Sequence, residues 1–330
     1  MLELRGVTKR YGDRVAVDDL SLTVSPGKMV GFVGTNGAGK TTTMRIIMGV
    51  LQQDVGQVLW RGAPADADAR RTFGYMPEER GLYPKMRIRD QLIYLAKLRG
   101  TDPARATKAA DQLLAEFGLA ERAGDRVEQL SLGNQQRVQL AAALVHDPEF
   151  LILDEPFSGL DPVGVDALAD SLHTRVSKGV GVLFSSHQLE LVERLCDEVV
   201  IIQAGKIVAA GPVAELREKH QKRQFRLVVG APAGWSAAVT AGRTIFEASA
   251  GDGLTETLVE LADGADSQVL LDAARARGPV LEFRRLTPTL AELFREAVTD
   301  TDDTPSSPTR TSTSWADFSR NAAQTPEVSA

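Results

Sequence analysis

The fold of this chain is decided by the stretch Gly34-Thr35-Asn36-Gly37-Ala38-Gly39-Lys40-Thr41. It matches the pattern G-x-x-x-x-G-K-[ST], in which the glycines let backbone N–H groups turn inward around phosphate oxygens. An apolar run, Met29–Val33, precedes it and a helix is expected over residues 42–48, so the pattern has the strand and the helix that it requires. We therefore favour a nucleotide site over a chance glycine-rich turn, with Lys40 reaching the β- and γ-phosphates and Thr41 a Mg²⁺ ion.

Length and composition limit what else the chain can be. It has 330 residues, enough for about two domains, and its 43% apolar and 25% charged residues are typical of globular proteins. A net charge of −6, from 38 basic and 44 acidic residues, disfavours a nucleic-acid partner. One cysteine, Cys196, excludes an internal disulfide. No apolar run approaches the roughly 18 residues of a spanning helix, and no signal-peptide pattern is found, so a cytoplasmic location is expected.

Strands and helices are expected to alternate over residues 1–218, the pattern of an α/β protein with a largely parallel sheet. The clearest strands are expected at 2–7, Met29–Val33, 72–75, Phe150–Leu153, 180–185 and 199–203. Two helical segments, 88–99 and 104–117, follow each other without a strand between them. They predict a helical insertion at about 86–146, where a partner could dock.

The pattern changes after about residue 222. Strands are expected at 225–229, 244–248, 257–261 and 280–283, with helices at 269–276 and 288–298. These elements indicate a small α+β domain over residues 222–298. The remainder, 299–330, is rich in Ser, Thr and Pro and poor in aromatic residues, which predicts a disordered tail.

Two carboxylates, Asp154 and Glu155, follow the strand expected at Phe150–Leu153. Open α/β sheets bind their ligands at such carboxyl ends of strands. We expect Asp154 to face the Mg²⁺ ion through water and Glu155 to polarise the water that attacks the phosphate. His187 follows the strand at 180–185 and is a candidate for a contact with the γ-phosphate. Taken alone, a solvated acidic strand end and a structural histidine are the simpler interpretations.

A third segment, Leu130-Ser131-Leu132-Gly133-Asn134-Gln135-Gln136-Arg137, resembles the signature LSGGQ, followed by Q-R, of ATP-binding cassettes. It departs from the signature at Leu132 and Asn134. With the other motifs, in the same order, it makes residues 2–218 similar to the cassette of an ABC transporter. The resemblance implies a P-loop NTPase fold with a helical insertion, followed here by the small domain and the tail.

The resemblance also implies a head-to-tail homodimer with ATP between two chains. The phosphate loop of one chain would face Ser131 and Gly133 of the other. Ser131 keeps a hydroxyl donor, and Gly133 lets a backbone N–H approach phosphate closely. We expect the signature to open a helix at 135–145, whose amino end would offer unpaired N–H groups to the γ-phosphate.

Single residues gain roles from the same resemblance. Tyr11 is expected to stack on adenine, and Asp161 to belong to the D-loop that couples the two sites, although Ser158-Gly159-Leu160-Asp161 alone is a turn pattern. Glu78 stands where the family's Q-loop usually has glutamine. Its carboxylate can approach Mg²⁺ or orient water, but it adds negative charge beside Glu155. The expected ATP contacts are Tyr11, Gly34, Thr35, Asn36, Gly37, Ala38, Gly39, Lys40, Thr41, Thr42, Ser131, Gly133 and Asp161. The expected catalytic residues are Lys40, Glu78, Glu155 and His187, and those near Mg²⁺ are Thr41, Glu78 and Asp154.

A narrower resemblance, to ATP-binding subunits of type-2 ABC exporters, includes sodium-efflux and antibiotic-resistance ATPases. It rests on Glu78-Glu79-Arg80-Gly81-Leu82-Tyr83, on the small domain and on the segment from Leu286 to Phe294. It implies an ATP hydrolase that powers a separate transmembrane permease at the inner face of the cell membrane, docked at the loop 78–86. Two other functions stay open: a soluble ABC ATPase that remodels a macromolecular complex, and a weakly hydrolysing regulatory module.

Overall fold

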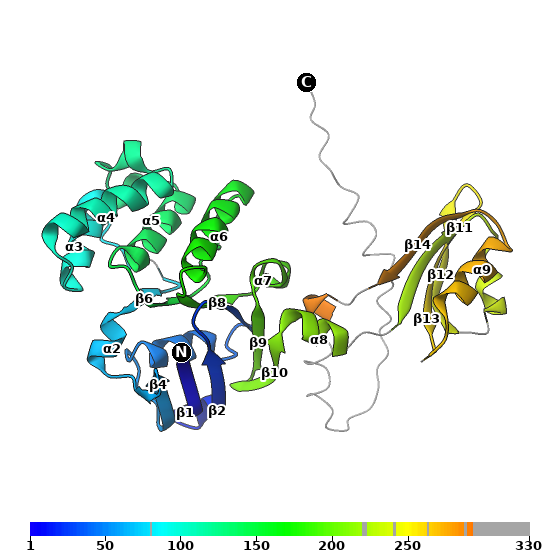
Figure 1. Ribbon diagram of the computed structural model, residues 1–330, viewed down its shortest axis with the longest axis horizontal. Coiled ribbons are helices and arrows are strands. Elements are labelled where there is room, and N and C mark those ends of the chain that lie inside the picture. Colours follow the sequence, from blue (N-terminus) through cyan, green and yellow to red (C-terminus); the bar gives the residue numbers. More distant parts are fainter. Residues whose placement is uncertain (80, 220–222, 240–241, 263, 287–288, 293–330) are drawn as a thin grey trace.

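The computed structural model describes residues 1–292 except 80, 220–222, 240–241, 263 and 287–288. The tail predicted at 299–330 lies outside the described residues, and so does most of the helix predicted at 288–298. The described part contains three sheets, of which two adjoin the helices α1–α8 and the third follows later in the chain (Figure 1). None of its helices has the length and apolar character needed to cross a membrane.

The motifs are carried by a six-stranded sheet with the order β10-β9-β3-β8-β7-β6. Its strands are β3 (Met29–Val33), β6 (Phe73–Met76), β7 (Phe150–Leu153), β8 (Gly181–Ser186), β9 (Glu198–Gln203) and β10 (Lys206–Pro212). All neighbours pair in parallel except β10, which is antiparallel at one edge. The predicted, largely parallel sheet is thereby confirmed. Its direction brings the carboxyl ends of β3, β6, β7 and β8 to the same edge.

A second sheet is antiparallel, with the order β2-β1-β4-β5. It consists of β1 (Leu2–Tyr11), β2 (Arg14–Val24), β4 (Val55–Trp60) and β5 (Ala63–Pro64). The sequence predicted only part of β1, because the other strands are partly exposed and lack a continuous apolar run. Leu4 packs in one core with Phe32 of β3 and Ile46 of α1 (Lys40–Ile47). This core fixes α1, and with it the phosphate loop, between the two sheets.

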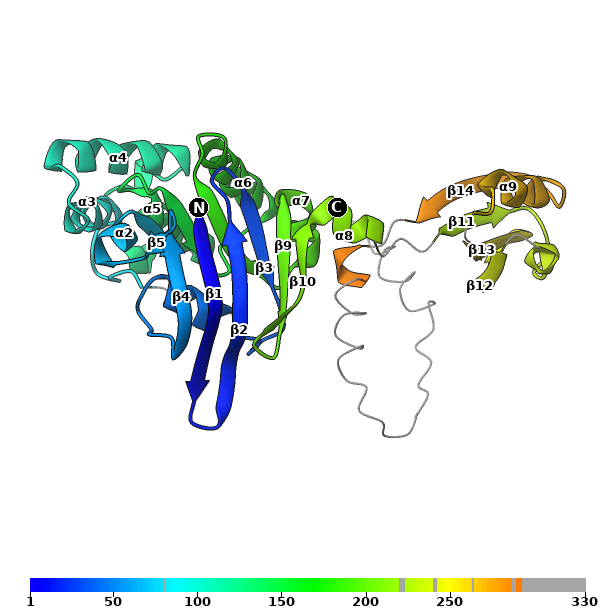
Figure 2. The same ribbon diagram turned by 60° about the horizontal axis from the view of Figure 1, so that its bottom comes forward.

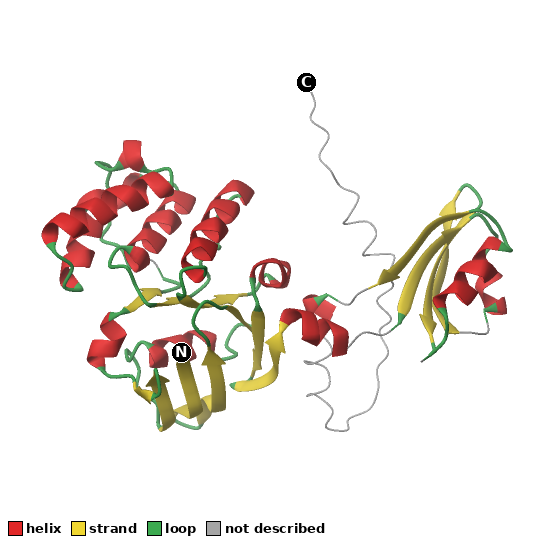
Figure 3. Ribbon diagram, in the orientation of Figure 1, coloured by secondary structure: helices red, strands yellow, loops and turns green. Residues whose placement is uncertain are grey.

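Helices cover the other face of the six-stranded sheet (Figure 3). They are α3 (Ile88–Leu98), α4 (Pro103–Glu116), α5 (Leu132–Leu144), α6 (Pro162–Val176) and α7 (Leu189–Leu195), and shorter elements are α2 (Ala67–Arg71), α8 (Val213–Lys219) and the 3-10 turns Ala120–Arg122 and Val127–Gln129. Alternate strand residues serve the two cores: Leu151 and Phe184 face the helices, whereas Ile152 and Leu183 face the antiparallel sheet. Both faces are thus covered, which explains why every residue of β3, β7 and β8 is buried.

The third sheet has a core of its own (Figure 2). It is antiparallel, with the order β12-β13-β11-β14. Its elements are β11 (Gln224–Val229), β12 (Gly242–Gly251), β13 (Leu254–Leu261), β14 (Val280–Leu286), α9 (Ser267–Arg275) and the 3-10 turn Trp235–Ala238. Leu227 and Val259 pack against Leu270 of α9. After β14 the chain places Leu290, fully buried, among the residues that pack with α3–α7, and the Leu290 N–H donates to Glu193 Oε2 (3.1 Å).

Candidate active site at the carboxyl edge of the parallel sheet

The phosphate loop joins the buried end of β3 to the start of α1. Two of its glycines have no room for a side chain. A Cβ on Gly34 would lie 2.4 Å from the carbonyl oxygen of Ile202, and one on Gly39 would lie 2.5 Å from that of Ala16. Gly39 also has a φ of 112°, which L side chains rarely adopt. The loop is therefore held by close backbone packing, while Thr35, Asn36 and Gly37 stay exposed.

Lys40 lies over this loop and does not extend into solvent. It is 7% exposed, and its ammonium donates to the carbonyl oxygens of Gly34 (2.7 Å) and Thr35 (3.2 Å). Thr41 and Thr42, half-buried in the first turn of α1, follow it. The amino end of the helix and the lysine thus offer positive charge at one place, which suits a phosphate group.

The carboxylates after β7 form a bonded cluster with the end of β8. Ser185 Oγ donates to Asp154 Oδ1 and accepts from the Glu155 N–H (2.9 Å). Glu155 Oε2 lies 2.9 Å from His187 Nδ1. Glu155 also has a φ of 51°, a left-handed conformation that is unusual for glutamate. Strain of this kind is typical of functional positions, and it turns Glu155 toward His187 on the neighbouring strand.

Asp154 is the most deeply buried carboxylate of this cluster. It is 1% exposed, and its Oδ2 atom is buried without any hydrogen-bond partner. Buried polar atoms in folded proteins are nearly always satisfied, so an orphaned carboxylate oxygen indicates a missing donor or cation. Lys40 and Thr41 begin α1 directly after the loop that follows β3, and only β8 lies between β3 and β7 in the sheet. The cluster therefore fits a divalent cation chemically.

Glu78 reaches the same edge from a third strand. It follows β6, which pairs in parallel with β7, and the Asp154 N–H donates to the Met76 carbonyl oxygen (2.8 Å). Its side chain is exposed. The structure thus places Glu78 and Glu155 after adjacent strands, although no hydrogen bond of the Glu78 side chain is among those described.

The signature segment starts its helix earlier than predicted. We expected a helix over 135–145, but α5 begins at Leu132, because the Ser131 hydroxyl caps it by accepting from the Asn134 N–H (3.4 Å). Gly133 therefore lies in the first turn, and Leu132 is 59% exposed. The first-turn N–H groups of α5 point away from the body of the helix, as in any helix.

Two further predicted residues have defined settings. Asp161 caps α6 by accepting from the Gly164 N–H (2.8 Å), and it lies 3.6 Å from Arg137 of α5. Tyr11 ends β1 and is 51% exposed. These settings of Asp161 and Tyr11 do not test the roles that the resemblance implies for them. Three further residues were not predicted from the sequence: Ser185 and Gln136 hydrogen-bond to the cluster, and Gln139 hydrogen-bonds to the loop that carries Glu78.

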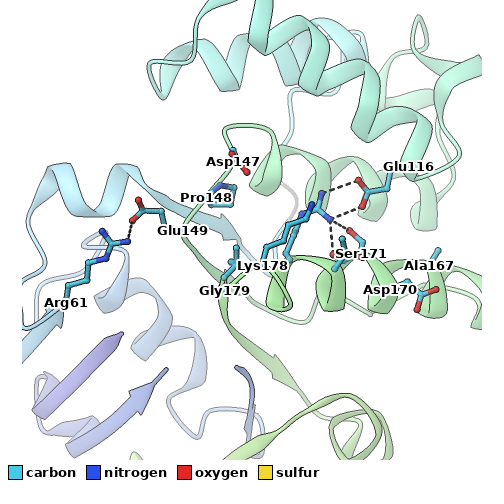
Figure 4. A pocket seen from close by; sticks show the side chains of 13 residues that line it. Arg61, Glu116, Asp147, Pro148, Glu149, Ala167, Asp170, Ser171, Lys178 and Gly179 are labelled. Carbon is cyan, nitrogen blue, oxygen red and sulfur yellow. Dashed lines mark hydrogen bonds and ion pairs between the residues drawn. The ribbon is translucent and has the colours of Figure 1, made fainter. Parts of the chain in front are cut away.

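A cleft of about 860 Å³ lies at the opposite edge of the sheet (Figure 4). Glu149 and Gly179, which precede β7 and β8, line it. Four of the charged side chains that line it are paired: Arg61 with Glu149 (2.9 Å), and Arg175 with Glu116 through two hydrogen bonds of 2.8 and 3.1 Å. None of the predicted site residues lines this cleft, so we assign the chemistry to the carboxyl edge.

Comparisons with known proteins agree with this geometry. The family model "ABC transporter" matches residues 17–158, and the model "ATP-binding protein DrrA1-3-like, C-terminal domain" matches residues 211–298. The uncharacterized ABC transporter ATP-binding protein YhaQ of Bacillus subtilis (strain 168) is 46% identical over 227 residues, which are 69% of this chain and 76% of YhaQ. The linearmycin resistance ATP-binding protein LnrL of the same organism is 35% identical over 219 residues, 66% of this chain and 70% of LnrL.

A solved structure described as the ATP binding subunit of an ABC transporter has a TM-score of 0.63 and 32% identity, and the match covers 66% of this chain and 92% of that one. The fold and the carboxyl edge define an ATP-binding cassette. The chain belongs to the ATP-binding proteins of ABC transporters and carries a C-terminal domain of the DrrA1-3-like type. Membership implies that it binds ATP and hydrolyses it.

Proposed function

We propose that this chain is the ATP-hydrolysing subunit of an exporter and that it powers a separate membrane permease. The observation that carries the proposal is the carboxyl edge itself, where the phosphate loop, the Asp154–Glu155 pair and His187 follow three neighbouring strands. This is the arrangement that phosphoryl transfer needs, with positive charge at the phosphates and a base beside them. The resemblance of LnrL, whose name gives it a part in linearmycin resistance, supports export.

Glu155 is the proposed general base. His187 holds its Oε2 atom, and Ser185 fixes its backbone, so that the carboxylate is oriented before substrate arrives. In this position Glu155 polarises the water that attacks the γ-phosphate, and Lys40 leaves the loop carbonyls to contact the phosphates. His187 then serves both to orient Glu155 and to contact the γ-phosphate.

The cluster is proposed to hold Mg²⁺ with ATP. The Thr41 hydroxyl is the ligand we assign, the orphaned Oδ2 atom of Asp154 faces the ion through water, and Glu78 contributes from the end of the next strand. When bound, the ion neutralises charge on the phosphates. A carboxylate at position 78 makes the site more acidic than an amide would, which strengthens the attraction for a cation.

The proposed active unit is a head-to-tail pair of chains. Two large apolar side chains, Leu132 and Val163, begin α5 and α6 and are 59% and 73% exposed. The two helix starts lie together, since a Cβ on Gly133 would be 3.4 Å from the Gly159 carbonyl oxygen. A second copy would cover these side chains while its phosphate loop meets Ser131 and Gly133.

The permease is proposed to dock where aromatic side chains stand exposed on the helical region. The rings of Tyr83 and Tyr94 contact each other edge to face at 6.4 Å, and they are 55% and 41% exposed. Leu98, one turn beyond Tyr94 on α3, is 63% exposed. Tyrosine is enriched in protein interfaces, and this surface lies beside the Glu78 loop, so movement of the loop can reach the partner. Through this contact the chain would sit at the inner face of the membrane.

The test is capture of the chain from gently solubilised membranes of its native cell. Glu155→Gln with ATP and Mg²⁺ would hold the closed state, and we expect one polytopic membrane protein in stoichiometric amount. The matched control combines Tyr83→Ser and Tyr94→Ser with Glu155→Gln. It should still bind ATP, but it should no longer capture the membrane protein. Arg89, at the start of α3, also lies near this surface, but its substitution would be ambiguous. Its side chain makes a bidentate ion pair with Asp111 of α4. Recovery of soluble partners alone would contradict the transport function and favour a remodelling ATPase.

A further inference from the structure

Three side chains of α5 cross to the loops that carry the catalytic residues. Gln136 Nε2 donates to the carbonyl oxygens of Glu155 (3.1 Å) and Pro156 (3.0 Å). Gln139 Nε2 donates to the carbonyl oxygens of Pro77 (2.6 Å) and Glu79 (3.4 Å). The carbonyl groups that Gln139 contacts lie on either side of Glu78. One of the two that Gln136 contacts belongs to Glu155, the proposed base. Arg137 adds a contact with Asp161 at the start of α6.

The two glutamines share one face of α5. They are three positions apart, which places them one above the other on a helix, and they are 7% and 4% exposed. A buried helix that donates to both loops at once cannot move along its axis without moving them. The same helix begins with Ser131 and Gly133, so one rigid element joins the signature to Glu155 and Glu78.

Gln139 has a feature that packing alone does not explain. Its Oε1 atom is buried and has no hydrogen-bond partner among the described residues. An amide buried with one unsatisfied end destabilises a fold relative to an apolar side chain of the same size. A leucine at this position would remove that cost, although the Pro77 and Glu79 carbonyl oxygens would lose this donor. The donation to the Glu78 loop is what a leucine could not supply.

We propose that Gln136 and Gln139 are positioning residues that couple the two ATP sites of the dimer. The inference rests on the proposed head-to-tail pair, in which the signature of one chain faces ATP bound by the other. Contact of ATP with the amino end of α5 shifts this helix. The two glutamines then carry the shift to Glu155 and Glu78, which act on the ATP bound to the same chain as α5. Occupation of one site thereby readies the other, and the coupling is reciprocal.

The experiment compares steady-state ATP hydrolysis by three full-length variants with that of the wild-type protein. Gln139→Leu and Gln136→Leu remove the crossing hydrogen bonds and keep the side-chain volume. Gln135→Leu is the matched control, because the Gln135 amide donates only to the Leu130 carbonyl oxygen in its own segment (3.0 Å). The rate, the KM for ATP, the Hill coefficient and the melting temperature are measured for each.

We expect the wild-type protein to hydrolyse ATP with a Hill coefficient clearly above 1, below the limit of about 2 for two coupled sites. Gln139→Leu and Gln136→Leu should lower kcat about tenfold and the Hill coefficient to about 1, with KM within about twofold, since the phosphate loop is intact. The melting temperature of Gln139→Leu should change little, because loss of the buried, unsatisfied Oε1 atom offsets loss of the donor to the Pro77 and Glu79 carbonyl oxygens. A merely structural role would instead lower the melting temperature and leave the Hill coefficient unchanged.

The outcomes separate this inference from the proposed function. A wild-type protein that does not hydrolyse ATP overturns both. A wild-type protein that hydrolyses ATP without cooperativity, or crossing variants that behave like Gln135→Leu, overturns the coupling alone. Hydrogen exchange of the wild-type protein gives a test without substitutions: addition of Mg-ATP should protect residues 77–79 and 132–139 together. Protection of only one of these segments would contradict the inference.

Discussion

The six-stranded sheet has one edge at the carboxyl ends of its parallel strands and another at their amino ends. The polar groups at these two edges differ in how they are paired. At the carboxyl edge Asp154 has a buried carboxylate oxygen without a hydrogen-bond partner. At the amino edge Glu116 and Arg175 are joined by two hydrogen bonds, and Arg61 pairs with Glu149. The orphaned oxygen of Asp154 awaits a ligand, whereas these paired side chains hold elements of the fold together. Function and stability are therefore expected to respond to different substitutions.

The largest effect is expected at the carboxyl edge. Glu155→Gln keeps the shape of the side chain and removes the base, so kcat should fall by about 10²- to 10⁴-fold while ATP binding is kept. The value of kcat is measured from the release of phosphate over time, and ATP binding from equilibrium titration with a fluorescent ATP analogue. Hydrolysis at a near-normal rate would remove Glu155 from the role of base.

A smaller effect, on stability, is expected at the amino edge through His146, which lies between α5 and β7. Burial and the charge of Arg99 lower the pKa of His146 to about 4, and its Nε2 lies 3.1 Å from the Phe73 carbonyl oxygen. The unfolded chain binds a proton at higher pH than the folded chain does, so stability is complete above about pH 6.5 and falls with pH toward 4. Between pH 7.5 and pH 5 the loss should be about 2 kcal/mol.

Urea unfolding at the two pH values measures this loss. His146→Gln cannot titrate and should lose less stability than the wild-type protein on acidification. His173→Gln removes an exposed histidine of α6 and is the control, with the wild-type dependence on pH. If His146→Gln and His173→Gln lose the same stability on acidification, His146 is not the group whose protonation destabilises the fold.

The smallest effect is expected for the ion pair in the cleft. Burial would raise the pKa of Glu116, but hydrogen bonds from Arg175 and Ser171 lower it on balance. The pair therefore stabilises the fold at neutral pH and stops doing so as the pH falls through the lowered pKa. Its side chains are 37% and 20% exposed, so solvent screening limits the effect of Glu116→Gln to about 1 kcal/mol or less. Thermal unfolding measures this change, and kcat should stay within about twofold of the wild-type value.

The contrast between the edges also explains what could be predicted from the sequence. The phosphate loop is one continuous stretch of sequence, and so is the Asp154–Glu155 pair. Each could therefore be recognised together with the strand that precedes it. Gln139 could not be, because it acts on Pro77, 62 positions away. Ser185 looked like an ordinary strand end, and only the pairing of β7 with β8 shows that its hydroxyl joins the Asp154 carboxylate to the Glu155 backbone N–H.

Errors in the elements have physical reasons too. The start of α5 was predicted three residues late, because Gly133 and Asn134 favour turns, whereas the Ser131 cap begins the helix ahead of them. The strand β2 was missed because its partly exposed residues give no continuous apolar run. The roles of all the predicted site residues, Tyr11, Glu78 and Asp161 among them, stay predictions.

The central claim is that the carboxyl edge of one chain becomes a complete ATP site only against the signature of a second. Light scattering with size-exclusion chromatography on Glu155→Gln tests it most directly. With ATP and Mg²⁺ we expect twice the monomer mass, and with Ser131→Arg added on the same background we expect the monomer with ATP still bound. A Glu155→Gln protein that binds ATP and stays monomeric, or a dimer that Ser131→Arg does not affect, would contradict the account.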